Sequence, residues 1–283
     1  MKVLVFGKTG QVATELCRYA DVTALDRAQA DLSDPTACAR IIAQTDADVI
    51  INAAAYTAVD QAENDEALAS VINADAPTAM AKAAAKRGLP FLHISTDYVF
   101  DGTGTQPRGA LAASSPINAY GRTKLAGEQG IVTTGGTYAI LRTSWVFSAH
   151  GANFVKTILR LGAERDALNI VNDQIGGPTA AADIAETLLK MAKTLHAGEG
   201  RSSIYHYSGA PDASWADFAG TIFDKSGLEV DITGIPSSAY PTPAPRPLNS
   251  RLDCSTLQKV FGIPRPDWHA GLDAVLHELG ETK

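Results

Sequence analysis

A tyrosine stands four positions before a lysine, as Tyr120 and Lys124, in a segment with the pattern of a helix start. Residues with this spacing lie on one face of a helix, about 6 Å apart. A lysine ammonium at that distance favours the ionised form of a phenol, whose pKa is ordinarily about 10. The pair is a candidate acid–base centre, although the same spacing also occurs by chance in helices without chemistry.

A glycine-rich turn near the N-terminus offers a place for a dinucleotide. An apolar run at residues 2–6 leads directly into Gly7 and Gly10, and a helical pattern follows. Glycines in such a turn let the backbone bend sharply, and they let a pyrophosphate approach the N–H groups at the start of the helix. The third small position is Ala13, which a helix–strand contact accommodates. A P-loop is excluded, because its upstream glycine would fall at Lys2.

The second predicted strand, residues 22–25, ends at Asp26, which lies 19 residues after Gly7. A carboxylate that binds the adenosine ribose is expected after roughly 20 residues. Asp26 favours the free 2′-hydroxyl of NAD, whereas Arg27 can bind the 2′-phosphate of NADP. The residues therefore permit either cofactor, and Arg27 favours NADPH with NADH also used. A solvated Asp–Arg turn is the alternative without a cofactor.

Further strands alternate with helices, which predicts a Rossmann-type doubly wound parallel sheet of the α/β class. We expect strands at residues 48–52, 90–94 and 138–141, and a helical region at 66–87 that is interrupted near Pro77. Ligands bind at the carboxyl ends of strands in such sheets. The residues expected at this edge are Ala53, Ala54, Ala55, Tyr56 and Thr57 after the third strand, and Ser95, Thr96 and Asp97 after the fourth.

The regular alternation ends near residue 150. We predict a dinucleotide-binding domain at 1–150 and mainly a substrate-binding portion of mixed α/β structure at 151–283, with a helix near 180–192 packing back on the first domain. This second portion is expected to contain a helix at 153–161 and strands at 168–171 and 204–207.

A proline-rich loop at residues 236–247 interrupts the second portion, since it contains five prolines. Between residues 232 and 252 there is no acidic residue, but Arg246 and Arg251 are present. This locally basic segment suits an anionic diphosphate, with a solvated basic loop as the alternative.

The amino-acid composition limits the classes of partner that the protein can bind. The 283 residues carry a formal net charge of −7, which argues against general binding to nucleic acid or to acidic membrane surfaces. The three cysteines and six histidines show no disulfide or metal-ligand spacing, and His93, within a strand, is expected in the core. The N-terminus enters a strand without a signal-peptide core, and no apolar run approaches 18 residues. We expect a cytoplasmic protein.

These motifs together resemble the extended short-chain dehydrogenase/reductases, which act on nucleotide sugars. The resemblance rests on the glycine turn, Asp26, the segment 95–97 and the pair of Tyr120 and Lys124. It is closest to the branch that reduces dTDP-linked 4-keto-6-deoxy sugars, and it runs nearly end to end. Seven ordered segments carry that closer resemblance: 6–12, 52–60, 95–100, 120–128, 142–145, 172–179 and 246–253.

The resemblance implies reduction of a nucleotide-sugar C4 ketone by NADPH or NADH. Tyr120 would protonate the ketone oxygen as hydride reaches the carbon, and Lys124 would tune Tyr120 and bind the nicotinamide ribose. Thr96, 24 residues before the tyrosine, would hydrogen-bond the same oxygen. The other implied cofactor contacts are Gly7, Gly10, Gln11, Val12, Asp26, Arg27, Asp31, Leu32 and residues 53–57; the substrate contacts are Thr96, Asp97, Trp145, Arg246 and residues 172–179.

Several alternatives stay open. A 4,6-dehydratase needs an acidic pair after the threonine, and Tyr98 at the second position counts against it. An epimerase uses the same tyrosine and lysine but keeps its cofactor. A regulatory subunit of this fold binds NADP without catalysis, and the intact set of Thr96, Tyr120 and Lys124 counts against that reading. The resemblance also suggests a homodimer and a bound Mg²⁺ ion, for which Glu15 is a candidate ligand. The residues alone establish neither of these properties.

Overall fold

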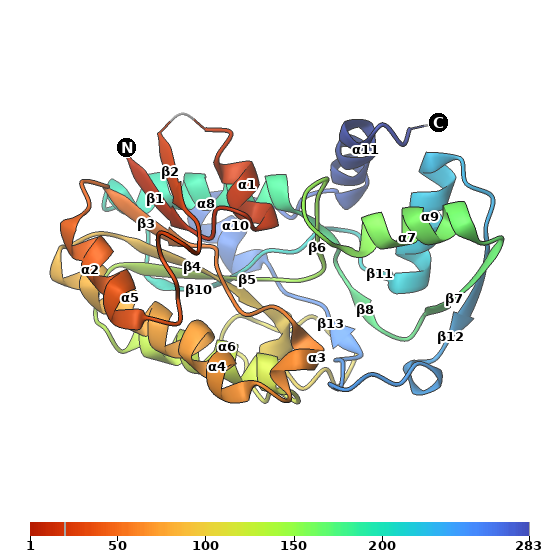
Figure 1. The fold of residues 1–283 in the computed structure, drawn as a ribbon, viewed down its shortest axis with the longest axis horizontal. Helices are drawn as coiled ribbons and strands as arrows, with labels where there is room; N and C mark the ends of the chain where they lie inside the picture. Colours follow the sequence, from red (N-terminus) through yellow and green to blue (C-terminus); the bar gives the residue numbers. More distant parts are fainter. Residues whose placement is uncertain (20, 283) are drawn as a thin grey trace.

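The computed structural model, which describes residues 1–19 and 21–282, has a six-stranded parallel sheet at its centre (Figure 1). The strands pair in the order β10-β5-β4-β3-β1-β2. Their bounds are β1 Val3–Phe6, β2 Val22–Leu25, β3 Val49–Asn52, β4 Phe91–Thr96, β5 Tyr138–Thr143 and β10 Ser203–His206. The predicted Rossmann-type sheet is confirmed. One correction concerns β10, expected in the smaller portion: it pairs with β5, because its buried Tyr205 and His206 complete this sheet.

Helices cover both faces of the sheet (Figure 1). On one face α1 packs against α8, and both share an apolar core with the strands and α10. On the other face α2, α5 and α6 form a second core. The bounds are α1 Gln11–Leu16, α8 Ala181–His196, α10 Ser255–Phe261, α2 Pro35–Gln44, α5 Ala76–Lys86 and α6 Ala119–Val132. The helix predicted near 180–192 is α8, so the chain after residue 150 contributes to the main sheet as well.

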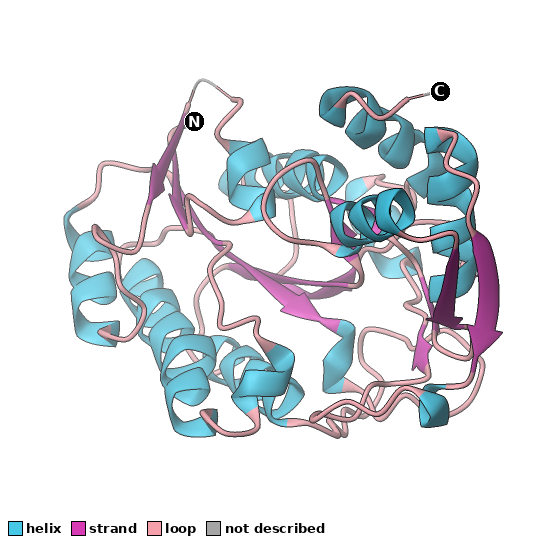
Figure 2. Cartoon of the chain, turned by 45° about the vertical axis from the view of Figure 1, so that its right-hand side comes forward, coloured by secondary structure: helices cyan, strands magenta, loops and turns pink. Residues whose placement is uncertain are grey.

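A smaller mixed part lies beside the main sheet, on the right of Figures 1 and 2. Its core is rich in aromatic side chains from α7, α9 and α11. The expected helix and strand in this part are α7 and β7, with slightly shifted bounds. The bounds are α7 Phe154–Glu164, α9 Trp215–Ser226, α11 Trp268–Leu279, β6 Val146–Phe147, β7 Ala167–Val171, β8 Ile175–Gly176, β9 Thr179–Ala180, β11 Ala213–Ser214, β12 Asp231–Ile235 and β13 Asn249–Ser250.

Short helical segments link β3 to α5. They are α3 (Val59–Ala62), α4 (Glu66–Ser70) and a π-helical turn, η1 (Val71–Asp75). The predicted interruption near Pro77 is confirmed in form: the α-helical pattern gives way to η1, and Pro77 lies in the first turn of the new helix α5, where its missing N–H costs no helical hydrogen bond. The backbone stays helical through η1. Within the described residues, every helix is too short or too polar to span a bilayer.

The turn η1 packs unusually close to α6. A Cβ added at Gly127 of α6 would lie 2.0 Å from the backbone oxygen of Asn73 in η1, closer than any real carbon–oxygen contact. Only glycine therefore permits this approach. The contact sets how α6 lies over the sheet.

We expect Gly127→Ala to lower the free energy of unfolding by about 1–3 kcal/mol, because the added methyl group overpacks the contact with η1. A matched control is Gly220→Ala in α9, where the new Cβ would meet Ile232 Cδ1 at 3.8 Å, an ordinary contact. There the higher helix propensity of alanine should leave stability unchanged or raise it by up to about 1 kcal/mol. Urea unfolding measures both, and a Gly127→Ala variant as stable as the parent would contradict the tight contact.

Candidate active site

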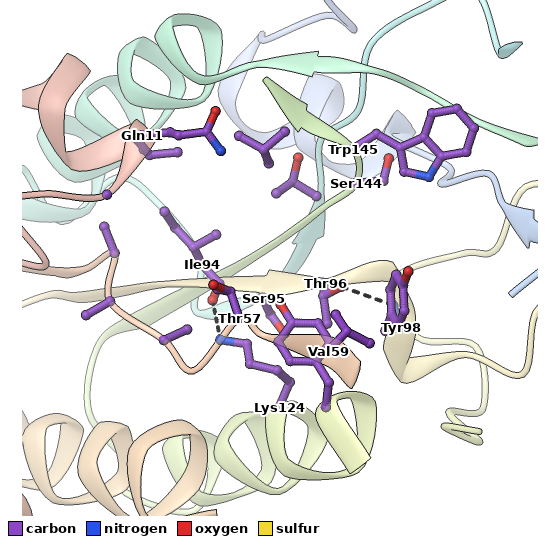
Figure 3. Close-up of a pocket in the computed structure, with 18 of the residues that line it drawn as sticks. Gln11, Thr57, Val59, Ile94, Ser95, Thr96, Tyr98, Lys124, Ser144 and Trp145 are labelled. Carbon is purple, nitrogen blue, oxygen red and sulfur yellow. Dashed lines mark hydrogen bonds between the residues drawn. The ribbon is translucent and has the colours of Figure 1, made fainter. Parts of the chain in front are cut away.

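A cleft lies at the carboxyl ends of β1, β3, β4 and β5 (Figure 3). It consists of two cavities of about 520 and 320 Å³, which share Gly10, Thr57 and residues 53–55 as lining and are therefore continuous. The cleft brings together most of the residues singled out from the sequence, although they are spread between Gly7 and Trp145.

The two cavities divide the predicted residues between them. The larger is lined by Gly10, Gln11, Val12, Ala53, Ala54, Ala55, Thr57, Thr96, Asp97, Tyr120, Lys124 and Trp145. The smaller is lined by Gly7, Gly10, Asp26, Arg27, Asp31, Leu32, Ala53, Ala54, Ala55, Tyr56 and Thr57. Arg246 lies outside both sets. The cofactor and substrate roles of these residues stay predictions.

The glycine turn forms the floor where the cavities meet. Gly7 has a φ of +108°, and a Cβ there would lie 2.9 Å from the backbone nitrogen of Ala54. Glycine is thus required both by the backbone conformation and by the close approach of the loop segment that follows β3. Ala13, which stands where the third glycine would be, is completely buried in the main core, so its methyl group is accommodated.

Asp26 and Arg27 lie at the far end of the smaller cavity. Asp26 accepts a hydrogen bond from the backbone of Gln29 at 3.0 Å. Arg27 Nε lies 3.2 Å from Asp31 Oδ2, and the Arg27 side chain is 78% exposed. The backbone N–H of Ser33 is the main cause of the lowered pKa of Asp31, and Arg27 adds to it. A carboxylate and a guanidinium therefore border the same cavity, as recognition of an adenosine ribose or its phosphate requires.

Tyr120, Lys124 and Thr96 meet at the junction of α6 and β4. Asn118 caps α6 by accepting a hydrogen bond from the backbone of Gly121 at 2.8 Å, which fixes the helix start two residues before Tyr120. Thr96 is the last residue of β4, and it lines the same cavity as Tyr120. An acid, a cation and a hydroxyl donor thus border one cavity.

The pKa of the Tyr120 phenol is shifted in the direction opposite to the one expected from the sequence. Burial raises the pKa of Tyr120, the Thr96 hydroxyl opposes the rise, and Asp97 adds to it. Lys124 Nζ instead donates to the Ile94 carbonyl at 2.7 Å (Figure 3). It also lies 3.0 Å from His93 Nε2. The expected lowering of the phenol pKa by Lys124 is therefore wrong for this chain, because desolvation dominates. The phenol is held in its protonated form, the form that a proton donor needs.

Burial lowers the pKa of Lys124 to about 8, and the negative charge of Glu128 opposes this shift. His93 is completely buried, which confirms the expectation of a core histidine. Its contact with Lys124 was not predicted. A lysine with this pKa exchanges its proton near neutrality, whereas an exposed lysine does not.

Asp97 and Trp145 border the part of the cleft nearest the smaller portion. Burial raises the pKa of Asp97 to about 6, its Oδ1 accepts from the Thr96 hydroxyl at 3.1 Å, and its Oδ2 has no hydrogen-bond partner among the described residues. Trp145 has a φ of +50° and stacks on Trp215 with ring centroids 3.6 Å apart. A strained tryptophan and an unpaired carboxylate oxygen suit a ligand with an apolar face and hydroxyl donors.

The arginines of the basic loop are less available to bind an anion than the sequence indicates. Arg246 Nη2 lies 2.9 Å from Asp60 Oδ2, and Arg251 Nε lies 3.5 Å from Asp212 Oδ2. Both guanidiniums are therefore balanced by carboxylates. An anion could bind Arg246 only by competing with Asp60. The segment 172–179 reaches the site differently, since Gly176 packs against the ring of Trp145.

The candidate metal ligand Glu15 lies in an ion-pair network. Its carboxylate, Glu278 and His150 Nε2 have ligand atoms within 4.8 Å of one another. However, Arg18 contacts Glu15 at 3.1 Å and Glu278 at 2.6 Å, so a guanidinium already balances both carboxylates. Mg²⁺ also prefers an octahedron of oxygen ligands. These residues do not fit a magnesium site as arranged, and we derive no step through a metal.

Asn73 is a structural contributor that sequence reasoning missed. Its Oδ1 accepts from the backbone N–H of Tyr56 at 2.8 Å, and its Nδ2 donates to the Tyr56 carbonyl and to Thr123 Oγ1, each at 3.1 Å. It thereby ties the cofactor-side segment to α6. The feature of the sequence that could have identified Asn73 is that an asparagine, which is a poor helix former, stands within an alanine-rich helical stretch.

Comparisons with known proteins agree with this geometry. Residues 1–281 match the family described as the RmlD substrate binding domain. The chain is 43% identical to a dTDP-4-dehydrorhamnose reductase of Burkholderia thailandensis and 41% identical to one of Salmonella typhimurium, covering 99% and 100% of this chain and 99% of each relative. The crystal structure of such a reductase from Bacillus anthracis in complex with NADP is 34% identical, with a TM-score of 0.92 over 98% of this chain and 100% of that one.

We expect Asp97→Asn to raise the free energy of unfolding at pH 8 by up to roughly 3 kcal/mol, because the folded-state pKa of about 6 exceeds the ordinary 3.8. Burying this carboxylate disfavours the folded state once it ionises. The gain should shrink as the pH falls through 6 and vanish below about 4.

Urea unfolding from pH 4 to 8 measures this dependence. Asp101→Asn is the control with the opposite sign, since the backbone N–H of Thr103 lowers the pKa of Asp101, and that variant should be the less stable one at pH 8. A gain in Asp97→Asn that does not change with pH would contradict the assignment.

Proposed function

Because this chain belongs to the RmlD substrate binding domain family, we propose that it reduces the C4 ketone of dTDP-4-dehydro-6-deoxy-L-mannose to dTDP-L-rhamnose, the last step of dTDP-rhamnose biosynthesis. NADPH or NADH is the reductant. The single observation that carries the proposal is that Thr96, Tyr120 and Lys124 line one cavity with the glycine turn that follows β1. The full-length relatives with the same enzyme name support it.

In this proposal Tyr120 is the proton donor. A nicotinamide held in this cleft would supply hydride to C4, so that negative charge would develop on the ketone oxygen. The Tyr120 hydroxyl, kept protonated by burial, gives its proton to that oxygen, while the Thr96 hydroxyl stabilises the developing charge. Lys124, one helical turn later on the same face of α6, would bind the nicotinamide ribose.

The residues of the smaller cavity would hold the adenosine end of the cofactor. The backbone turn at Gly7 allows close approach of a pyrophosphate, and Asp26 and Arg27 would contact the ribose or its 2′-phosphate. On the substrate side, Asp97 Oδ2 would accept from a sugar hydroxyl, and Trp145 would cover an apolar face of the sugar. Arg246 would contact the diphosphate after leaving Asp60.

The direct test supplies dTDP-4-dehydrorhamnose and NADPH to the purified chain and identifies the product by NMR. The proposal predicts dTDP-L-rhamnose. The C4 epimer as product would assign the chain to another nucleotide-sugar reductase. No turnover, with NADP binding retained, would favour a regulatory subunit.

We expect Tyr120→Phe to bind NADPH with unchanged affinity but to turn over about 100 to 10,000 times more slowly, because phenylalanine fills the same space without a proton to donate. Cofactor fluorescence and steady-state kinetics measure the two properties. Tyr138→Phe, which removes a phenol at the start of β5 outside the cleft, is the control and should keep parental rates. Turnover of Tyr120→Phe near the parental rate would remove the assigned role.

We expect Arg27→Ala to lower kcat/KM with NADPH about tenfold or more and to leave NADH nearly unaffected, since only NADPH carries the 2′-phosphate that a guanidinium binds. Arg40→Ala, an exposed arginine on α2 away from both cavities, is the control for loss of a positive charge. Kinetics with both cofactors give the preference ratio. The same ratio before and after the substitution would exclude Arg27 as the selecting residue.

A further inference from the structure

Two buried polar side chains connect the sheet to Lys124. Asn52 ends β3 and is paired in register with His93 of β4, and neither side chain is exposed. Asn52 Nδ2 lies 3.1 Å from His93 Nδ1, and His93 Nε2 lies 3.0 Å from Lys124 Nζ. A continuous hydrogen-bonded chain therefore runs from the sheet to the catalytic lysine, and the mechanism above uses neither Asn52 nor His93.

The direction of these hydrogen bonds follows from what each group can donate or accept. The backbone N–H of Ala54 donates to Asn52 Oδ1 at 3.1 Å, so the amide NH₂ of Asn52 is turned toward the imidazole. Burial and then the charge of Lys124 lower the pKa of His93 well below its ordinary value, so the ring is neutral. A neutral imidazole has one N–H and one acceptor nitrogen. Since Nδ1 accepts from Asn52, the ring proton is on Nε2, facing Lys124 Nζ.

The two protonation states of Lys124 respond differently to that N–H. An ammonium has three N–H groups and no lone pair, so it cannot accept from His93 and is repelled by its proton. A neutral amine accepts from His93 Nε2, donates to the Ile94 carbonyl at 2.7 Å and keeps one further N–H. We propose that Asn52 and His93 are positioning residues that favour the neutral amine of Lys124 and so make its ammonium a stronger acid.

The catalytic meaning of this arrangement rests on the proposed function. Each ketone reduction leaves Tyr120 as a tyrosinate. In the proposal, a proton passes from Lys124 Nζ to the tyrosinate oxygen through the cavity that both residues line, and the electron pair left on nitrogen accepts the hydrogen bond from His93 Nε2. Solvent then returns the proton to the lysine. A more acidic ammonium makes the first of these transfers easier.

Other groups around Lys124 shift its pKa in opposite directions. Burial, the largest effect, lowers its pKa, and Glu128 on the next turn of α6 raises it. Glu128 is itself paired with Arg142 of β5 at 2.5 Å, which weakens its influence. The remaining titratable groups among the described residues that line the same cavity are Tyr120 on α6 and Asp97 and Tyr98 after β4. The His93 N–H acts in the same direction as burial.

Asn52→Asp and His93→Gln test the proposal with small changes in shape. A carboxylate at position 52 only accepts, so the ring proton moves to Nδ1, and Nε2 becomes an acceptor for the ammonium. A glutamine at position 93 offers Lys124 a carbonyl oxygen without adding charge. We expect the acid dissociation constant of Lys124 to fall tenfold or more in both variants. His277→Gln, which replaces an exposed histidine on α11 outside the cleft, should leave it unchanged.

The measurement is an NMR titration of the lysine ¹⁵Nζ signals in the cofactor-free protein. Loss of one signal in Lys124→Met assigns Lys124, and thermal unfolding shows that each variant is folded. A fall in the dissociation constant in both variants supports the proposal. An unchanged constant in His93→Gln overturns it, even if Asn52→Asp shifts, because the added negative charge alone would then explain that shift. The titration needs no substrate, so its outcome is distinct from absence of ketone reduction.

Discussion

A buried ion pair fixes α6, the helix that carries Tyr120 and Lys124, on the sheet. Glu128 of α6 accepts two hydrogen bonds from Arg142 of β5, at 2.8 and 2.5 Å, and one from Ser95 of β4 at 2.5 Å. Removing either charged partner would leave the other uncompensated in the interior, at a cost of about 3–5 kcal/mol. The helix can therefore neither slide nor rotate over the strands. Lys124 and Tyr120 lie one and two turns before Glu128 on the same face of α6, so the ion pair fixes their positions as well.

The same burial determines the chemistry of the cleft. Desolvation raises the pKa of Tyr120 and Asp97 and lowers that of Lys124, so each group is shifted toward its neutral form. A protonated phenol suits reduction of a ketone, in which the enzyme must supply a proton. Asp97 and the positive φ of Trp145 are both unfavourable for stability, and both border the region where the sugar would bind. Stability is lowered where ligand contacts are expected.

Much of this arrangement can be predicted from the sequence, because turns and strand ends have local signatures. The glycine turn, Asp26 and Thr96 follow short apolar strands, and a parallel sheet brings their carboxyl ends to one edge. What the sequence does not indicate depends on contacts between distant segments. The pairing of Arg246 with Asp60 and the contact of His93 with Lys124 carry no local pattern. The pKa shift of Tyr120 was missed for the same reason, since burial results from the whole fold. Helices α9 and α11 are defined by the aromatic core that they share.

In the proposed reaction, Tyr120 completes a net ketone reduction by hydride from the cofactor. Turnover of dTDP-4-dehydrorhamnose with NADPH that carries deuterium on the transferred face of the nicotinamide tests this proposal, because both the label and the cofactor can be followed. We expect one NADP⁺ to be released for each dTDP-L-rhamnose formed, with deuterium at C4 of the sugar. Turnover of the sugar without net release of NADP⁺, as in an epimerase that returns the hydride, would contradict it.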